Sequence, residues 1–346
     1  VEEAAAPGID TGKAIQLVDS GTAANIGGGQ ADNIYFGTYQ QSSDGSVGYN
    51  TDPIKWRVLE NADGQLFLLS DQNLDVFQYH TEYESVTWET STMRSWLNGY
   101  SASHNTGGDS GTDYTSDNFI GTAFSEKEQG AIADTTVVND DNPDYNTEGG
   151  NDTTDQIFLL SIEEVQNADY GFTDDSSRIA TNTAYVADGG EINSHMNGVG
   201  EADYWWLRSP GYDAYDAADV NYFGGVLSGG IDVYDVSDAV RPAFNLDLTS
   251  VLFTSAAVGG KSANGMDSGL TAIGNYDGNE WKLTILDEDR SNFSASTSSQ
   301  TTVNDNYSDW KITLNYENAM SYDAETAPNE YISVIIADSN GSALYY

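Results

Sequence analysis

The sequence predicts an α+β protein in which short strands dominate and helices are few and short. From residue 31 onward, runs of aromatic and β-branched residues alternate with turns rich in Gly, Asn and Asp, which is the pattern of strands. Only a few segments place apolar residues at helical spacing. From residue 270 strand patterns recur with no helical segment between them, so a small all-β domain is expected at the C-terminal end.

The first strands are the runs NIYFGTYQQ, IKWRVLE and GQLFLLSD. The last two are separated by NADG (61–64), and an Asp-Gly pair between alternating runs is typical of a tight hairpin turn. We therefore expect these two runs to pair as a β-hairpin.

Three segments carry helix signals. In TSTMRSWLNGY, Met93, Trp96 and Leu97 lie on one helical face and Gly99 supplies a stop. Two further starts have capping boxes, in which a serine is followed three residues later by a glutamate: Ser125 with Glu128, and Ser161 with Glu164. The run QIFLLS before the second box reads as a buried strand.

The segment YWWLRSP (204–210) begins a series of short runs split by glycine pairs, which predicts a β-meander closing the domain near Leu248. In a strand, Trp205 and Trp206 point to opposite faces, so each is expected to pack against a different layer. Arg208 and Arg241 are interpreted as structural, each holding a carboxylate or backbone carbonyls.

These patterns divide the chain into four parts. Residues 1–30 are small and polar and read as a flexible N-terminal arm. Residues 31–250 form the α+β domain, 251–269 a linker, and 270–346 an immunoglobulin-like β-sandwich.

Composition limits the classes of partner. Asp and Glu number 55 against 12 Lys and Arg, a formal net charge of −43, so nucleic acid and anionic membrane surfaces are expected to be repelled. No apolar run is long enough for a transmembrane helix, and membrane insertion is not expected. Cysteine is absent, which excludes disulfides and thiol chemistry.

Nothing in the sequence marks a catalytic site. The three histidines, His80, His104 and His195, are far apart in the chain and lack the spacing of a zinc motif. No carboxylate pair stands out among so many acids, and no nucleophile has a recognisable base. We therefore expect the protein not to be an enzyme.

The segment 211–238 mixes tyrosine and aspartate with small residues, the composition of a recognition surface. Tyrosine gives rigid contact area, and short polar side chains give adaptable hydrogen bonds. The alternative is a solvated meander whose tyrosines only brace its edges. The predicted ligand-binding residues are Tyr212, Asp213, Tyr215, Asp216, Asp219, Asn221, Tyr222, Tyr234 and Asp235.

A calcium site is the one cofactor that the sequence suggests. Asp140, Asn142 and Asp144 alternate through the turn-rich loop 139–155, and hard oxygen ligands at such spacing can wrap Ca²⁺. The alternative is a solvated acidic loop. An EF-hand is not formed, because Tyr145 stands where that motif needs glycine.

Eight motifs in order resemble a domain family of unknown function from secreted and surface proteins of Gram-positive clostridia. They are IYFGTYQQ, PIKWRVLE, LFLLSD, TWETSTMRSWLN, AFSEKEQGAI, FLLSIEEV, YWWLRSPG and VRPAFNL, spanning about residues 31–248. The ending also resembles, more distantly, the C-type-lectin-like fold of formylglycine-generating enzymes and phage tropism determinants. The resemblance implies an extracellular C-type-lectin-like domain, whereas the catalytic cysteines of those enzymes have no counterpart here.

Two functional hypotheses follow. The first is a noncatalytic, secreted or cell-surface protein that presents its tyrosine and aspartate residues to a glycan or a protein. The second is a structural subunit that assembles into an extracellular filament or surface array through its N-terminal arm or an open sheet edge.

Overall fold

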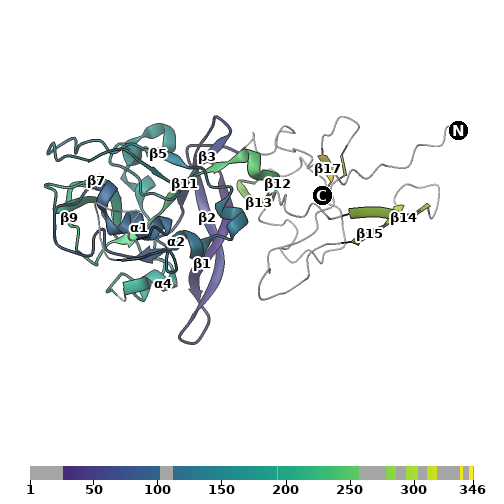
Figure 1. The fold of residues 1–346 in the computed structure, drawn as a ribbon, viewed down its shortest axis with the longest axis horizontal. Coiled ribbons are helices and arrows are strands. Elements are labelled where there is room, and N and C mark those ends of the chain that lie inside the picture. Colours follow the sequence, from purple (N-terminus) through teal and green to yellow (C-terminus); the bar gives the residue numbers. More distant parts are fainter. Residues whose placement is uncertain are drawn as a thin grey trace.

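The computed structural model describes residues 26–101, 112–192, 194–256, 278–285, 294–302, 310–317, 336–337 and 343–345 (Figure 1). These residues form a mixed α+β structure in which sheets dominate and helices are short. The coarse fold class predicted from the sequence is therefore confirmed.

The larger sheet lies at the centre of Figure 1, where the long β1–β2 hairpin stands out. In the described residues it has six strands in the order β11-β3-β2-β1-β13-β12. Their bounds are β1 (Asn33–Ser43), β2 (Tyr49–Ala62), β3 (Gln65–Ser70), β11 (Ala243–Asp247), β12 (Val251–Ala256) and β13 (Glu280–Ile285).

The predicted hairpin between the second and third runs is confirmed. β2 and β3 pair antiparallel, and Ala62 lies opposite Gln65 across the turn. Both turn residues have positive φ, 52° at Asp63 and 78° at Gly64. This is the conformation that a two-residue turn needs to match the strand twist, and Asp-Gly adopts it at low cost.

The second sheet, which includes β7 and β9, lies to the left of the first in Figure 1. Its order across the described residues is β4-β10-β7-β8-β9. Its strands are β4 (Asp75–Val76), β7 (Trp205–Pro210), β8 (Asp216–Val220), β9 (Val226–Asp232) and β10 (Ala239–Val240). β7, β8 and β9 form the predicted antiparallel meander. The chain then returns through β10, which is parallel to β7, and β11 enters the first sheet.

The helices are short, as predicted. Ser91 caps the first turn of α1, and Gly99, with a φ of 65°, ends the helix. The capping box of Ser125 and Glu128 forms at the start of α3. The α-helices are α1 (Thr92–Asn98), α2 (Phe119–Ala123), α3 (Glu126–Gln129) and α4 (Ala184–Ala187), and the 3-10 helices are η3 (Trp88–Thr90), η4 (Glu164–Gln166), η5 (Ala168–Tyr170), η6 (Asp175–Arg178), η7 (Gly190–Ile192) and η8 (Leu248–Ser250).

The region of the second capping box differs from the prediction. Ser161 and Glu164 exchange their hydrogen bonds, but only the 3-10 turn η4 follows. The run QIFLLS is buried yet forms a single bridge, between Phe158 and Ala243, rather than a strand. The carbonyl of Leu159 instead accepts a hydrogen bond from the Arg208 guanidinium.

The structure departs from the predicted domain boundaries at two places. Residues 26–30, expected in the arm, pack on β2: Ile26 is buried, and the Gly29 N–H donates to the Leu59 carbonyl at 2.7 Å. Residues 1–25 lie outside the described residues. At the other end, β12 falls in the predicted linker and β13 in the predicted sandwich, yet β13 pairs with β1 and β12 pairs with β13, so both extend the first sheet.

The rest of the predicted sandwich is described only in part. β14 (Ser294–Thr302) pairs with β15 (Trp310–Glu317), and β16 (Ile336–Ala337) pairs with β17 (Ala343–Tyr345). Residues 257–277, 286–293, 303–309 and 318–335 lie outside the described residues, and with them most of the predicted linker. In the described residues these strands form two separate pairs, and their arrangement as a sandwich stays a prediction.

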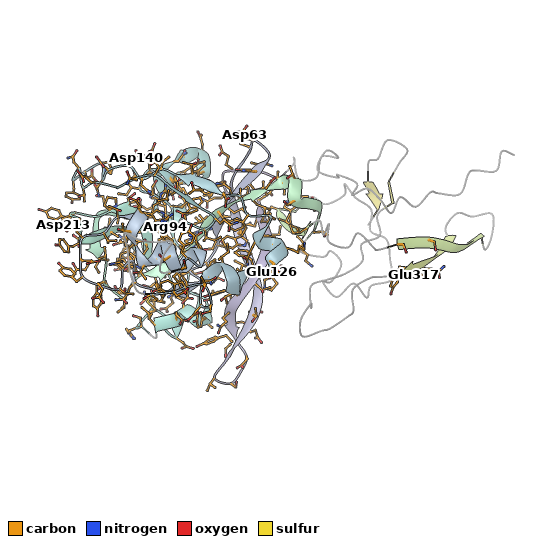
Figure 2. All side chains as sticks on the ribbon, in the orientation of Figure 1. Asp63, Arg94, Glu126, Asp140, Asp213 and Glu317 are labelled. Atoms are coloured by element: carbon orange, nitrogen blue, oxygen red, sulfur yellow. The ribbon has the colours of Figure 1, made fainter. Side chains whose placement is uncertain are left out.

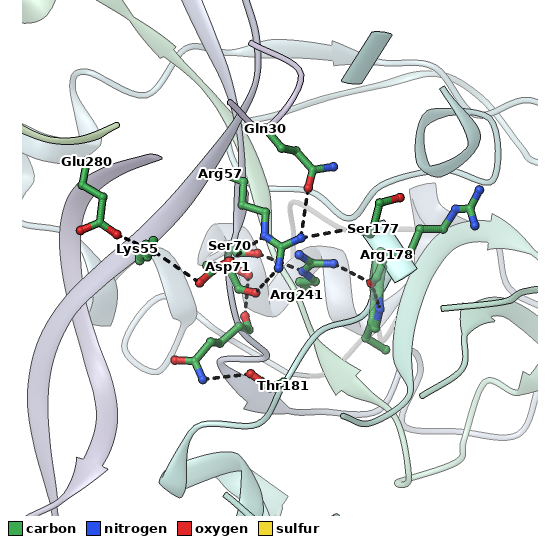
Figure 3. A network of polar contacts seen from close by, with 12 residues as sticks. Gln30, Lys55, Arg57, Ser70, Asp71, Ser177, Arg178, Thr181, Arg241 and Glu280 are labelled. Atoms are coloured by element: carbon green, nitrogen blue, oxygen red, sulfur yellow. Dashed lines mark hydrogen bonds and ion pairs between the residues drawn. The ribbon is translucent and has the colours of Figure 1, made fainter. Parts of the chain in front are cut away.

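Arg241 has the structural role that the sequence predicted, and it connects the two sheets. Arg241 is completely buried, donates to the carbonyls of Ser70 and Arg178, and stacks 4.8 Å above the Trp205 ring. Figure 3 shows this guanidinium beside the ion pair of Arg57 with Asp71. Trp205 and its neighbour Trp206 are both fully buried, so the start of β7 anchors the core.

Candidate recognition surface

The β7–β9 meander and its turns place four predicted tyrosines at the surface. Tyr212 is 64% exposed, Tyr215 40%, Tyr222 39% and Tyr234 52%. Asp213, in the turn between β7 and β8, is also exposed, and Figure 2 shows it at the left-hand edge of the molecule. We call the exposed and half-buried residues of 211–238, together with the rings of Tyr83 and Tyr145 that lie against them, the recognition surface.

Backbone contacts fix the turn that carries Tyr212. The Tyr212 N–H donates to the Gly229 carbonyl of β9 at 2.7 Å. The neighbouring Gly230 has a φ of +66°, and a Cβ there would lie 1.9 Å from the Ala217 carbonyl oxygen. Only glycine allows this close approach of β9 to β8, so the glycine pair of the sequence positions the tyrosine.

Two of the predicted polar residues hold turns. Asn221 is half-buried, and its Oδ1 accepts from the N–H groups of Phe223 and Gly225. Asp235 is half-buried, and its Oδ1 accepts from the Ser237 N–H at 2.7 Å. Such local side-chain bonds stabilise turns and leave less of each side chain for a ligand.

The structure adds three exposed rings that the sequence prediction missed. The Tyr83 ring lies 5.2 Å from the Tyr215 ring, and the Tyr145 ring lies 5.1 Å from the Tyr212 ring. Phe223 is 68% exposed and lies 4.1 Å from its neighbour Tyr222. Phe223 falls inside the predicted segment, but no local signal links Tyr83 or Tyr145 to it.

Negative charges crowd one side of the surface. Asp216 of β8 and Asp232 of β9 are direct cross-strand partners. Burial raises the pKa of Asp216 to about 6, and the charges of Asp213 and Asp232 add to this rise. The pKa of Tyr83 is also raised, mainly by the charge of Asp232.

Asp219 corrects the prediction, because it is only 2% exposed and cannot belong to the recognition surface. It lies in the middle of β8, between β7 and β9, where both faces of the sheet are covered. Asp238 is also buried, and Asp219 Oδ1 and Asp238 Oδ2 have no hydrogen-bond partner. Burial raises the pKa of Asp219 to about 7; burial and the charge of Asp219 raise the pKa of Asp238 well above its ordinary value.

In the predicted calcium loop, Asn142 already has partners within the fold. Asn142 is buried, its Oδ1 accepts from the N–H groups of Asp144 and Tyr145, and its Nδ2 donates to the Ser228 carbonyl. Within the described ranges no group of three or more His, Asp or Glu side chains is arranged to hold a metal ion. A calcium ion at Asp140, Asn142 and Asp144 stays a prediction.

A groove of about 450 Å³ lies apart from the recognition surface, between the β1–β2 hairpin and the start of α4. The residues around it include Gln41, Asp52, Gln72, Asn182 and Thr183. None of the predicted ligand-binding residues lines this groove.

Fold and surface together define a mixed α+β domain that carries exposed aromatic rings beside carboxylates. Residues 63–248, more than half of the chain, match the model of a domain of unknown function, DUF6273. The chain therefore belongs to the DUF6273 family. No curated protein and no solved structure matches the chain. In the part of the chain that the structure describes, no helix is both long and apolar enough to cross a membrane.

Proposed function

We propose that this protein is a noncatalytic recognition protein that binds a glycan or a protein through the recognition surface. The observation that carries the proposal is the set of exposed ring pairs, formed by Tyr212 with Tyr145 and by Tyr215 with Tyr83. Paired rings at a surface offer rigid area for ligand contact at a small entropy cost. The neighbouring aspartates add hydrogen-bond acceptors and charge.

The proposal includes a secreted or cell-surface location and a C-type-lectin-like fold for residues 31–250, followed by an immunoglobulin-like domain. Its support is the ordered series of motifs that resembles surface proteins of Gram-positive clostridia, together with membership of DUF6273 over residues 63–248. The high negative charge also suits a protein that does not bind nucleic acid.

Glycan and protein arrays test the proposal. The wild type is compared with Tyr212→Ala and Tyr215→Ala, and with Tyr316→Ala as a control, since Tyr316 is an exposed tyrosine of β15 outside the recognition surface. We expect the first two variants to lose array signals that the wild type and the control retain. Equal signals from all four proteins would contradict the proposal that the recognition surface binds the ligand.

Assembly into a filament or surface array is a second candidate. The observation in its favour is that β9 ends the five-stranded sheet, so within the described residues no strand pairs with its outer edge. An open edge can accept a strand from another subunit. Because the chain carries so many acids, assembly should need salt or Ca²⁺ to reduce repulsion between subunits. Electron microscopy with and without Ca²⁺ tests this, and single particles in both conditions would count against it.

A further inference from the structure

The aromatic part of the recognition surface around Tyr83 and Tyr215 is exposed, and no element among the described residues covers it. Tyr83 is 61% exposed and Tyr215 is 40% exposed, and their rings are tilted by 35° to each other. Exposed aromatic pairs are enriched where a partner binds, because they bury large areas on association. The charge around these rings indicates which partner fits them.

No basic side chain balances the acids of this surface. Residues 211–238 contain six aspartates and no Lys, Arg or His. Elsewhere in 26–256, five of the seven bases form ion pairs with acids of their own: Lys55, Arg57, Arg94, Arg178 and Arg208. Arg241 is buried, and Lys127 belongs to α3, whose Glu126 lies well away from Asp213 in Figure 2.

The acids beside the rings repel one another within the fold. Asp216 and Asp232 face each other across β8 and β9, and like charges in direct cross-strand pairs destabilise a sheet. Asp213 adds a third charge, since it contributes to the raised pKa of Asp216. Protonated Asp216 shares a side-chain hydrogen bond with Asp232, so the repulsion acts when both groups are ionised. A local arrangement that costs stability in its charged form is expected at functional surfaces.

The rings and the acids lie close enough to act on one ligand. The charges of Asp232, Asp213 and Asp216 all raise the pKa of Tyr83, so its ring stands near the three carboxylates. A basic side chain there would neutralise the carboxylates while its aliphatic stem packed on the rings, and a guanidinium or ammonium group is also attracted to a ring face.

We propose that this part of the recognition surface binds a protein segment that carries lysine or arginine next to apolar residues. The basic group lies among Asp213, Asp216 and Asp232, and the apolar residues pack on Tyr83 and Tyr215. This inference rests on the proposed function and selects a basic protein segment over a neutral glycan. A bare metal ion would satisfy the carboxylates but would leave the two rings uncovered.

Binding of a cation favours the ionised form of Asp216. Because its pKa lies at about 6, the free protein must release a proton to bind at lower pH. Affinity is therefore expected to rise by up to about tenfold per pH unit below pH 6 and to level off above that pH. The variant Asp216→Asn should lose this dependence.

The test uses a short labelled peptide of alternating lysine and tyrosine, and a matched peptide with glutamate in place of lysine. Fluorescence anisotropy compares the wild type with the double variant Asp216→Asn and Asp232→Asn, and with Tyr83→Ala. The control is Asp63→Asn with Glu126→Gln, which removes the same charge from exposed positions far from the surface in Figure 2. Thermal unfolding checks that each variant folds.

We expect the lysine peptide to bind and the glutamate peptide not to bind. Removing the two aspartates should weaken binding roughly tenfold or more, Tyr83→Ala severalfold, and the control less than about twofold. Equal weakening by the control would show unspecific charge attraction and overturn the inference, as would binding that ignores Tyr83. If the arrays identify a neutral glycan that needs Tyr212 or Tyr215, the proposed function stands and this inference fails. If neither the arrays nor the peptide gives binding, both fail.

Discussion

Removing the buried charge of Asp219 is expected to change how stability depends on pH. Asp219 is almost fully buried, and its Oδ1 has no hydrogen-bond partner. The variant Asp219→Asn replaces the carboxyl group by a neutral group of the same shape, which resembles the protonated acid. The folded protein then no longer has to bury a negative charge at this position.

The size of the effect follows from the pKa. Burial raises the pKa of Asp219 from 3.8 to about 7. The unfolded chain releases the carboxyl proton near pH 4, whereas the folded state keeps it up to about pH 7. The free energy of unfolding therefore falls as the pH rises from about 4 to about 7. At about 1.4 kcal/mol per pH unit, the contribution lost by pH 8 is on the order of 4 kcal/mol.

Urea denaturation at pH values from 4 to 8 measures the effect. Wild type and Asp219→Asn should differ least at pH 4, where the carboxyl group is protonated in the folded state and only partly ionised in the unfolded chain. At pH 8 the variant should be more stable by as much as about 4 kcal/mol, because it has no charge to bury. The remaining slope of the variant reports the other acids whose pKa values burial raises, which are Asp75, Glu191, Asp216 and Asp238.

A matched control separates this local effect from the charge of the whole protein. Lower pH also reduces the general repulsion of a chain with a net charge of −43. The variant Asp63→Asn removes one exposed charge from the β2–β3 turn and should keep the wild-type slope. The reasoning would be refuted if Asp219→Asn and Asp63→Asn changed the slope equally, or if Asp219→Asn were less stable than the wild type at pH 8.

Three further predictions test the packing of the two sheets. Gly230→Ala should lower the free energy of unfolding by about 3 kcal/mol or more in thermal unfolding, because its Cβ would lie 1.9 Å from a carbonyl oxygen. Gly64→Ala, with positive φ but nothing within 4 Å, should lower it by only about 1–2 kcal/mol. Equal losses in the two variants would contradict the close-approach explanation. Arg241→Met should lower the free energy of unfolding by about 2 kcal/mol, because two buried carbonyls lose their donor, and an unchanged denaturation midpoint would contradict this. Glu280→Gln removes the 2.7 Å ion pair with Lys55 and should lower the free energy of unfolding by less than about 1 kcal/mol. Hydrogen exchange should show faster exchange of the backbone amides of β13 in this variant.

Features that depend on a few neighbouring residues were predicted correctly. The Asp63-Gly64 turn, the glycine stop of α1 and the capping box of α3 each arise from dihedral preferences or from bonds to residues at most a few positions away. The exposure of Tyr212, Tyr215, Tyr222 and Tyr234 also followed from composition, because tyrosine among aspartate and small residues is typical of a recognition surface.

Features that depend on distant segments were predicted poorly. In β13, apolar and polar residues alternate as they would in a strand of a separate domain. Only its parallel pairing with β1 places β13 in the first sheet. Asn142 lies in the loop that was predicted to bind calcium, and its side-chain NH2 donates to the distant β9 carbonyl of Ser228. Neither pairing leaves a local signal in the sequence.

The sequence by itself determined the α+β class, the meander, and a surface rich in tyrosine and aspartate, because alternation, turn chemistry and composition act over short stretches of chain. The tertiary structure decided which acids face water. Asp216 and Asp219 belong to one short strand, yet the neighbours on both sides of β8 leave Asp216 at the surface beside Tyr83 and bury Asp219. Burial is a property of the layers around a residue, so only the packed sheets fix the charge that each aspartate carries.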